Sequence, residues 1–369
     1  MATTTTTKIT TPLRYQDTPE TTAHLNWADL ISLNLSIFDQ PGGKQQLATQ
    51  LRTAIHTIGF FYITNFGLTP SAIDSQFHLC NLIMDLPLSE KMTYVIDPSL
   101  PGGPLGYKPA GRYPLGDSGL RDNVEFYDDP KWNAHFRARS RPQPVVDAAA
   151  ETEAFARHMH HHVLYRLLVL VGIIMELEDE EALWKMHGYE RMSNCHLRYM
   201  RHVPRTEEEN DRLERKGGMI IPGHTDFGTF TFLFRQPVAA LQVRAEEGEE
   251  WKWVRPVMDA VVVNVADTIS FLTGGYLKSS THRVVTPPPD QRHIPRTSVI
   301  YFSRPDDETP LKAVDSPVIR REGDKSKAPP GGAITAGDWV SARYKDIYRL
   351  QQNAKEDVEV VIKEIEAGA

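Results

Sequence analysis

Two histidines and one aspartate constrain the fold of this chain more than any other feature. His224 and Asp226 stand two residues apart, and His282 follows much further along the sequence. In a strand, residues i and i+2 point to the same side, so the first two side chains can reach one metal ion from one short segment. The third ligand, His282, must then come from the end of a neighbouring strand. The chain therefore needs a sheet that brings two distant segments together.

The residue types in this set indicate which metal it would hold. Two imidazoles and one carboxylate on one face of an ion are typical of non-haem Fe(II), and they leave three coordination positions open. A His-x-Asp pair alone often arises by chance, and a hydrogen-bonded core histidine is the ordinary interpretation of His224 by itself. With His282, and with Arg296 and Ser298 shortly after it, the pattern favours an iron site with oxygen chemistry.

Arg296 and Ser298 also share one face of a predicted strand. A guanidinium can hold a carboxylate through two parallel hydrogen bonds, and a nearby hydroxyl can add a third. We interpret the pair as a clamp for the far carboxylate of a dicarboxylic cosubstrate. Taken in isolation, a strand arginine paired with a local acid is the ordinary alternative.

The apolar patterns predict helices in the first half of the chain and short strands in the second. Helices are expected at 45–58, 71–84 and 151–178, with a strand at 60–63 between the first two. The Gly- and Pro-rich stretch 97–145 is interpreted as a long loop region. Short strands are expected at 224–234, 241–243, 253–254, 260–265, 268–272, 283–286 and 298–302. This order predicts a mainly β fold with flanking α-helices, as a sandwich or jelly roll wrapped by helices.

The same patterns divide the chain into five segments. They are a disordered tail (1–23), an N-terminal α/β region (24–150), a long supporting helix (151–192), a β core (193–320) and a C-terminal helical segment (321–369).

Composition excludes several classes of partner. The chain has 369 residues and a net charge of −7, which is not the basic footprint of a nucleic-acid-binding protein. Anionic membranes would repel such a chain, and no apolar run approaches the roughly 18 residues that span a bilayer. Two cysteines, Cys80 and Cys195, make no disulfide framework and suit a reducing cytoplasm. The sequence does not predict the oligomeric state.

Two further clusters have an ordinary interpretation that we favour. The histidines of the segment 158–162 could hold a metal, but they also fit the polar face of the long helix. Cys195 beside His196 could be a nucleophile, but no third group that would orient the pair is evident, so a buried thiol is the better interpretation.

Several ordered motifs resemble one known family, the iron(II)- and 2-oxoglutarate-dependent dioxygenases of the isopenicillin N synthase type. The resemblance covers roughly residues 25–320. The segments that carry it are GFFYITNFGL (59–68), GY (106–107), DNVE (122–125), GHTDFG (223–228), LQV (241–243), NVAD (264–267), STHRV (280–284) and RTSVIYF (296–302).

The resemblance implies a double-stranded β-helix core. It implies that His224, Asp226 and His282 bind Fe(II), and that Arg296 and Ser298 bind the distal carboxylate of 2-oxoglutarate, with O2 as the second cosubstrate. The family usually has a tyrosine that contacts 2-oxoglutarate near the strand entering the core. The residues expected at this contact are His202, which stands at the tyrosine's position, and Tyr199 as a possible substitute.

The expected activity is oxidation of a small molecule, by hydroxylation, desaturation or cyclisation, in secondary metabolism. The residues expected to contact this substrate are Tyr107, Arg112, Phe126 and Phe227. Three alternatives stay open at this point. They are an Fe(II) oxidase of the same fold that does not use 2-oxoglutarate, a zinc hydrolase on the same triad, and a non-catalytic binding protein.

Overall fold

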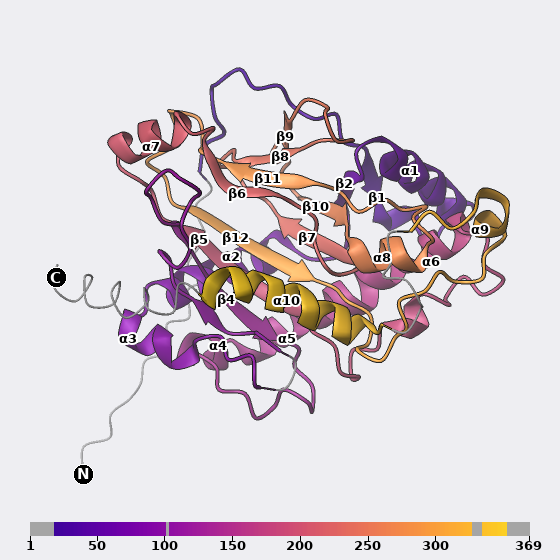
Figure 1. Cartoon of the computed structure of the whole chain (residues 1–369). Helices are drawn as coiled ribbons and strands as arrows, with labels where there is room; N and C mark the ends of the chain where they lie inside the picture. The colour runs from indigo at the N-terminus through magenta and orange to yellow at the C-terminus, as the bar shows by residue number, and fades with distance from the viewer. Residues whose placement is uncertain (1–17, 101–102, 327–333, 353–369) are drawn as a thin grey trace, which may run out of the picture.

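The computed structural model describes residues 18–100, 103–326 and 334–352, and two facing sheets form the centre of the molecule (Figure 1). The larger sheet has eight strands in the order β1-β2-β10-β7-β12-β5-β4-β3, and the smaller has four in the order β6-β11-β8-β9. Most neighbouring strands are antiparallel, and sequence neighbours often lie in different sheets. The predicted jelly-roll core with flanking helices is therefore confirmed.

The strands of both sheets are short. The larger sheet contains β1 (Ser32–Asn34), β2 (Phe60–Thr64), β3 (Tyr107–Lys108), β4 (Val124–Pro130), β5 (His196–His202), β7 (Phe230–Phe234), β10 (Ala260–Val265) and β12 (Arg296–Phe302). The smaller sheet contains β6 (Met219–His224), β8 (Leu241–Val243), β9 (Lys252–Trp253) and β11 (His282–Val285). The N-terminal region thus supplies four strands to the same sheet that carries β12.

Helices cover the outer face of the larger sheet. Helix α1 (Gly43–Thr57) packs on β2, and α2 (Pro70–Met84) packs on β4, β5 and β12. Helix α2 begins where the Thr69 side chain accepts a hydrogen bond from the Ala72 amide, an N-cap that satisfies a free backbone donor. The buried side chains of both helices join the largest apolar cluster of the protein.

The predicted long helix at 151–178 is present as three consecutive segments. These are α5 (Ala149–His158), a π-helical turn (Met159–Leu164) and α6 (Tyr165–Ile174). The remaining helices are α3 (Leu88–Lys91), α4 (Gln143–Asp147), α7 (Glu207–Glu214), α8 (Asp267–Leu272), α9 (Pro317–Glu322) and α10 (Ala336–Gln352).

The space between the two sheets holds two separate apolar clusters. One contains Phe60, Val243 and Val262, and the other contains Met200 and Ile300 with their neighbours. Because each cluster draws on strands of both sheets, burial of apolar surface holds the sheets together.

Three of the predicted elements are wrong or incomplete. The run at 268–272, expected as a strand, is helix α8, because a short buried apolar run has no period that separates helix from strand. The expected strand 224–234 is a strand end, a loop and β7. The expected loop 97–145 contains β4. The acidic residues of this strand made its sequence resemble a polar loop. In β4, Asp128 is paired with Arg198 at 2.7 Å and Asp129 with Arg141 at 2.7 Å, so the charges are buried as ion pairs.

Both termini were predicted only in part. The expected tail at 1–23 is wrong for residues 18–23, because the Thr21 hydroxyl and the Thr22 amide donate to the Asp290 carboxylate at 2.8 and 2.7 Å. Residues 1–17 lie outside the described part of the chain, and so do 353–369 of the expected C-terminal helical segment.

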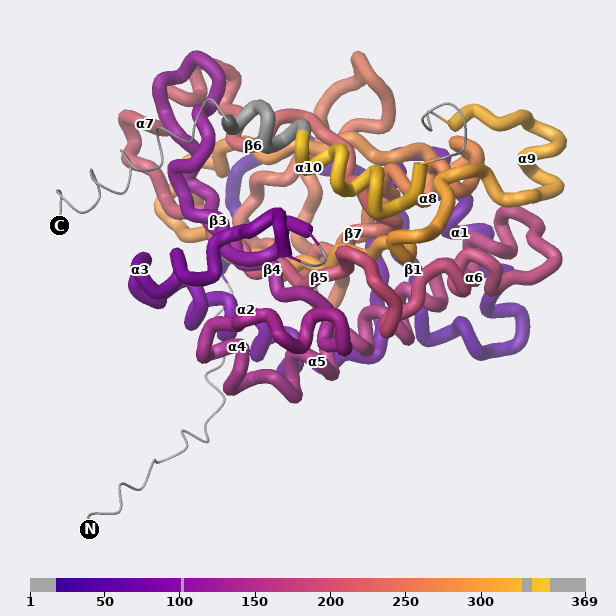
Figure 2. The backbone as a smooth tube through the Cα atoms, turned by 60° about the horizontal axis from the view of Figure 1, so that its bottom comes forward, coloured from indigo at the N-terminus to yellow at the C-terminus, as the bar shows by residue number. Residues whose placement is uncertain are grey.

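Helix α10 crosses the end of the sandwich beside α8 (Figure 2). Trp339 packs edge-on against Phe271 of α8 with ring centroids 5.1 Å apart, and Tyr344 packs against Phe227 at 5.6 Å. In the described part of the chain, no helix combines the length and the apolar character needed to cross a membrane.

Candidate active site

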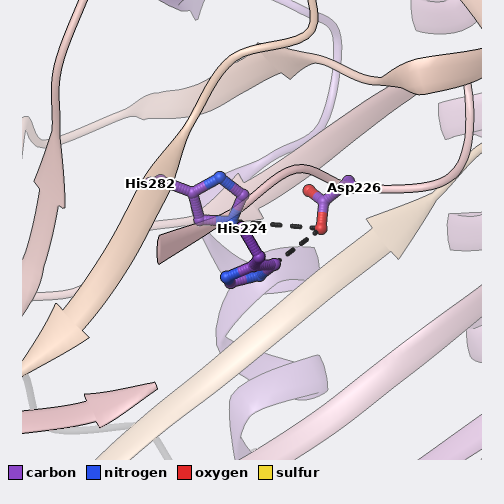
Figure 3. Close-up of side chains that lie close together, drawn as sticks. All are labelled: His224, Asp226 and His282. Carbon is purple, nitrogen blue, oxygen red and sulfur yellow. Dashed lines mark ion pairs between the residues drawn. The ribbon is translucent and has the colours of Figure 1, made fainter. Parts of the chain in front are cut away.

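Two strands of the smaller sheet and the loop after β6 bring the three sequence-predicted metal ligands together (Figure 3). His224 is the last residue of β6 and His282 is the first of β11, and the two residues pair directly across these antiparallel strands. Asp226 lies in the loop just beyond β6, so strand alternation does not place it, and that part of the expectation is wrong. Its backbone carbonyl accepts a hydrogen bond from the Asp267 amide at 2.9 Å, which turns the loop back towards the histidines.

A glycine makes this tight loop possible. A Cβ atom at Gly228 would stand 2.3 Å from the Ser303 carbonyl oxygen, closer than any real contact. The loop after Asp226 can therefore approach the chain beyond β12 only without a side chain at this position.

The three side chains form the one cluster of potential metal ligands found among the described residues. One ligand atom from each of His224, Asp226 and His282 lies within 4.8 Å of the others. The Asp226 Oδ1 atom is 3.9 Å from the Nε2 atom of each histidine. The imidazole centroids are 4.2 Å apart. A single ion between the three groups can contact all of them.

Both histidines are held in the tautomer that a metal needs. The Nδ1 atom of His224 is 2.9 Å from the Pro222 carbonyl oxygen, and that of His282 is 3.3 Å from the Ser280 carbonyl oxygen. A carbonyl can only accept, so Nδ1 carries the proton and Nε2 keeps its lone pair. Such second contacts fix the orientation of metal-ligating histidines.

The Asp226 carboxylate is oriented from the larger sheet. Its Oδ2 atom accepts hydrogen bonds from the Thr231 hydroxyl at 2.6 Å and the Asn264 side-chain amide at 2.9 Å. Thr231 belongs to β7 and Asn264 to the adjacent β10. Because Oδ2 is engaged, Oδ1 is left to face the two histidines. No sequence motif predicts these roles for Thr231 and Asn264, although strand alternation in β7 and β10 could have pointed to them.

The protonation states also suit a divalent cation. Burial opposes the charge on Asp226, but His282 and His224 and the hydrogen bonds to Thr231 and Asn264 outweigh it and lower its pKa to about 2. Burial and the neighbouring His224 lower the pKa of His282 to about 4. At neutral pH the site therefore offers a carboxylate and a neutral His282. This donor set fits Fe(II).

The predicted carboxylate clamp lies on β12 of the larger sheet. Arg296 and Ser298 are both buried, and Arg296 pairs with His202 of β5 in the sheet register. The Arg296 Nη1 atom is 3.4 Å from the His202 Nδ1 atom. Arg296 has no carboxylate partner within the described residues, and burial lowers its pKa to about 9. A buried arginine without a counter-charge is a site for an anion.

Gln236, for which no sequence pattern predicts a role, fills this clamp. The Arg296 Nη2 atom donates to the Gln236 Oε1 atom, and the Gln236 Nε2 atom donates to the Ser298 hydroxyl. Gln236 follows β7 by two residues. No periodicity or motif marks it, because its position depends on how the β7–β8 loop folds over β12.

Two of the expected contact residues lie elsewhere. Tyr199 points to the helical side of β5, where its hydroxyl donates to the Gln76 side chain at 2.7 Å, so it does not substitute at the clamp. The alternation of β5 places Tyr199 and His202 on opposite faces. Tyr107 is buried, and its hydroxyl donates to the Glu125 carboxylate at 2.8 Å. This contact gives Tyr107 a structural role.

Phe227 and Phe126 each lie against an arginine side chain. Phe227 follows Asp226 directly, and Arg343 of α10 lies 4.7 Å from the centre of its ring. Phe126 stacks under Arg198 at 3.8 Å and joins the apolar cluster of Met200 and Ile300. Arg112 lies 5.9 Å from the centre of the Tyr113 ring.

The two remaining clusters have structural roles in the described part of the chain. The His158 and His162 rings stack at 4.6 Å, and His158 Nε2 contacts the Phe66 carbonyl oxygen at 2.7 Å. Neither belongs to a group that could hold a metal. Cys195 is buried, with its sulfur 3.3 Å from the Arg304 carbonyl oxygen, and His196 stacks on Phe302.

Comparisons with known proteins agree with this geometry. Residues 192–305 match the model of the 2OG-Fe(II) oxygenase superfamily, and residues 29–150 match the N-terminal model of a non-haem dioxygenase in morphine synthesis. The first match contains all three predicted ligands and the clamp.

Individual relatives extend over most of the chain. The 2-oxoglutarate-Fe(II) type oxidoreductase hxnY of Emericella nidulans is 27% identical, covering 85% of this chain and 88% of its own. The 2-oxoglutarate-dependent dioxygenase tropC of Talaromyces stipitatus is 26% identical, covering 88% and 95%. Among solved structures, Neurospora crassa T7H in complex with alpha-KG and thymine has a TM-score of 0.73 at 20% identity, covering 88% of this chain and all of that one.

These findings decide between the alternatives. A zinc hydrolase, a binding protein and an oxidase without 2-oxoglutarate are not favoured, because the family models and the curated relatives specify 2-oxoglutarate-dependent oxygenases. The chain belongs to the 2OG-Fe(II) oxygenase superfamily and is a 2-oxoglutarate-dependent dioxygenase that uses Fe(II) and O2.

Proposed function

We propose that this enzyme oxidises a small organic molecule at an Fe(II) ion held by His224, Asp226 and His282. One observation carries the assignment. The Asp226 Oδ1 atom faces both histidine Nε2 atoms, while its Oδ2 atom is engaged by Thr231 and Asn264. An incidental ion pair would not need both oxygens and both imidazole tautomers to be fixed.

Arg296 and Ser298 are our candidates for binding the distal carboxylate of 2-oxoglutarate. Arg296 is 4% exposed and has no acidic partner in the described chain, and Ser298 beside it is fully buried. A dianionic cosubstrate would supply the missing negative charge through charge-assisted hydrogen bonds. His202, next to the guanidinium, completes the wall of this pocket as a neutral residue, because burial and Arg296 hold its pKa well below the usual range.

When bound, Fe(II) with 2-oxoglutarate and O2 supplies the oxidising power for attack on an unactivated C–H bond. The residues of the chain perform the positioning. The Asp226 carboxylate offsets part of the charge of the cation, and Thr231 and Asn264 fix the orientation of this carboxylate. Apolar clusters on either side of the polar residues exclude water from the interior.

We propose that Phe227 and Phe126 form part of the substrate wall. Phe227 adjoins the metal loop, and Tyr344 and Arg343 of α10 pack against its ring. These contacts support a site closed by aromatic and cationic groups. The contact of Arg112 with the substrate stays a prediction. A small substrate is supported by the thymine complex of the Neurospora T7H structure. Hydroxylation, desaturation and cyclisation all remain compatible, and the setting in secondary metabolism stays a prediction.

A cytoplasmic location is also proposed. Its support is that both cysteines, Cys80 and Cys195, are free and buried, as expected where thiols stay reduced. The absence of nucleic-acid and membrane partners stays a prediction from the negative charge.

The test is succinate formation by anaerobically purified protein loaded with Fe(II) and then given 2-oxoglutarate and O2. Wild type, Asp226→Ala and Arg296→Leu are compared, without and with a panel of small metabolites. We expect iron-dependent succinate from the wild type and none from either variant. Full turnover by Asp226→Ala would refute the ligand assignment, and full turnover by Arg296→Leu would refute the clamp.

A further inference from the structure

The glutamine in the clamp has the shape of the ligand that the clamp is proposed to bind. The Gln236 amide presents its oxygen to Arg296 and its nitrogen to Ser298. Its side chain is two methylene groups ending in a planar carboxamide. The distal half of 2-oxoglutarate is two methylene groups ending in a planar carboxylate. The two planar groups have nearly the same size and would occupy the same space.

The amide also provides a hydrogen-bond partner for the buried guanidinium when no cosubstrate is bound. A buried guanidinium whose donors are unpaired costs free energy, because water is removed and nothing replaces it. Gln236 Oε1 provides an acceptor for Arg296, while the Nε atom of Arg296 still has none in the described structure. The amide is neutral, so it satisfies the guanidinium only in part and leaves its charge uncompensated.

The backbone around Gln236 is held, so only its side chain is free to move. Arg235 is paired with Asp74 of α2 at 2.6 Å. On the other side, the Gln291 side chain donates to the Pro237 carbonyl at 2.9 Å and accepts from the Ala239 amide at 2.8 Å. Occupation of the clamp is therefore a matter of the Gln236 rotamer and does not require the loop to open.

The Gln236 side chain is half-buried rather than enclosed, so its amide can leave the clamp by turning towards the surface.

We propose that Gln236 is an internal competitor of 2-oxoglutarate, whose amide fills the carboxylate clamp of the free enzyme and must turn out before the cosubstrate binds. The proposal rests on the assignment of Arg296 and Ser298 as that clamp. On binding, Ser298 changes from accepting a hydrogen bond from the amide to donating one to the carboxylate. Gln236 thus sets the affinity for 2-oxoglutarate without contributing to the chemistry.

The first test removes the competitor. Gln236→Ala is compared with wild type by isothermal titration of 2-oxoglutarate into Fe(II)-loaded protein without O2, and by the visible absorption of the iron chelate. An enzyme whose competent fraction is about one tenth binds about tenfold more weakly than its intrinsic affinity. We therefore expect the variant to bind about tenfold more tightly, equal to about 1.4 kcal/mol. Gln236→Asn, whose amide is one carbon shorter, serves if the alanine variant is unstable.

The second test makes the competitor permanent. Gln236→Glu places a carboxylate against Arg296, so we expect 2-oxoglutarate to bind at least tenfold more weakly while the free protein melts at a higher temperature. Gln46 is an exposed glutamine of α1, and Gln46→Ala and Gln46→Glu are the matched controls, expected to bind as wild type does. Unchanged or weaker binding by Gln236→Ala, or unchanged binding by Gln236→Glu, would overturn the proposal.

Arg296→Leu separates this inference from the proposed function. If Arg296→Leu abolishes 2-oxoglutarate binding and Gln236→Ala leaves it unchanged, the clamp is right and the competitor is wrong. If Arg296→Leu still binds 2-oxoglutarate as wild type does, the clamp itself is wrong.

Discussion

The support of Asp226 from the larger sheet gives the sharpest prediction about the metal centre. Thr231→Val removes the hydroxyl that donates to the Asp226 Oδ2 atom at 2.6 Å and keeps nearly the same side-chain volume. The carboxylate then retains only the Asn264 amide, at 2.9 Å. It gains freedom to rotate, so Oδ1 is no longer held towards the two histidines.

The structure fixes the expected magnitude. A hydrogen bond to a charged group contributes about 1.5–3 kcal/mol, and Thr231 makes one of the two side-chain hydrogen bonds on Oδ2. Loss of an outer partner of a metal ligand costs about 10- to 100-fold in metal affinity. The two figures agree, since 1.4 kcal/mol corresponds to about tenfold. We expect Fe(II) affinity to fall about 10- to 100-fold in Thr231→Val, with the fold intact.

The assay is anaerobic titration of Fe(II) into the metal-free protein, with circular dichroism to confirm the fold. Thr297→Val is the matched control, because Thr297 is a buried strand threonine whose hydroxyl makes one weak contact with Asn81 at 3.5 Å, on the opposite face of β12 from Arg296. It should bind Fe(II) as wild type does. Equal Fe(II) affinity in Thr231→Val and wild type would show that Oδ2 needs no support and would refute the reasoning.

Three further predictions concern stability and closure. Burial lowers the pKa of His196 to about 3. Below about pH 6.5 the unfolded state therefore binds a proton that the folded state does not, and the free energy of unfolding falls as the pH drops. Relative to wild type, His196→Phe should gain about 1.4 kcal/mol of unfolding free energy per pH unit between pH 6 and 4 in urea unfolding, and a pH-independent difference would contradict this. Glu125→Gln leaves the buried Lys91, now 2.8 Å from Glu125, without its counter-charge and should cost about 3–5 kcal/mol in the same assay, against less than 1 kcal/mol if the pair were solvated. Tyr344→Ala removes the ring that packs on Phe227 and should increase succinate formed without substrate, whereas unchanged uncoupled turnover would show that α10 does not close the site.

The triad could be predicted from sequence because two of its members are close in the chain and the third follows a recognisable pattern. His224 and Asp226 stand two residues apart, so their ligand atoms cannot lie far from one another. His282 was expected at the end of a neighbouring strand, and the structure pairs it directly with His224 across antiparallel strands. The helices of the first half were equally accessible, since α1 and α2 bury clear apolar stripes. A pattern confined to one helix or strand can be read from the sequence, because it does not depend on how the elements pack.

What escaped prediction depends on contacts between elements. The β4 strand looked like a charged loop, because the sequence does not show that Asp128 meets Arg198 of the neighbouring strand. Alternation alone separates Tyr199 from His202, but only the pairing of β5 with β12 shows that His202 is the one beside Arg296. Gln236 carries no signal at all, since its role arises from the path of a loop across β12.

The division of labour between the two sheets explains why these contacts matter together. The smaller sheet supplies His224 and His282, whereas the larger sheet supplies Arg296 and the partners that aim Asp226. Neither sheet holds a complete site, so the distance between the sheets sets the distance between metal and clamp. That distance is maintained by the apolar clusters between the sheets. A core substitution such as Val262→Ala, at a residue that is itself no proposed ligand, should therefore weaken 2-oxoglutarate binding to the Fe(II) protein more than it weakens binding of Fe(II) alone. Binding of 2-oxoglutarate to both the metal and the clamp spans the two sheets, whereas the two histidine ligands lie on one sheet.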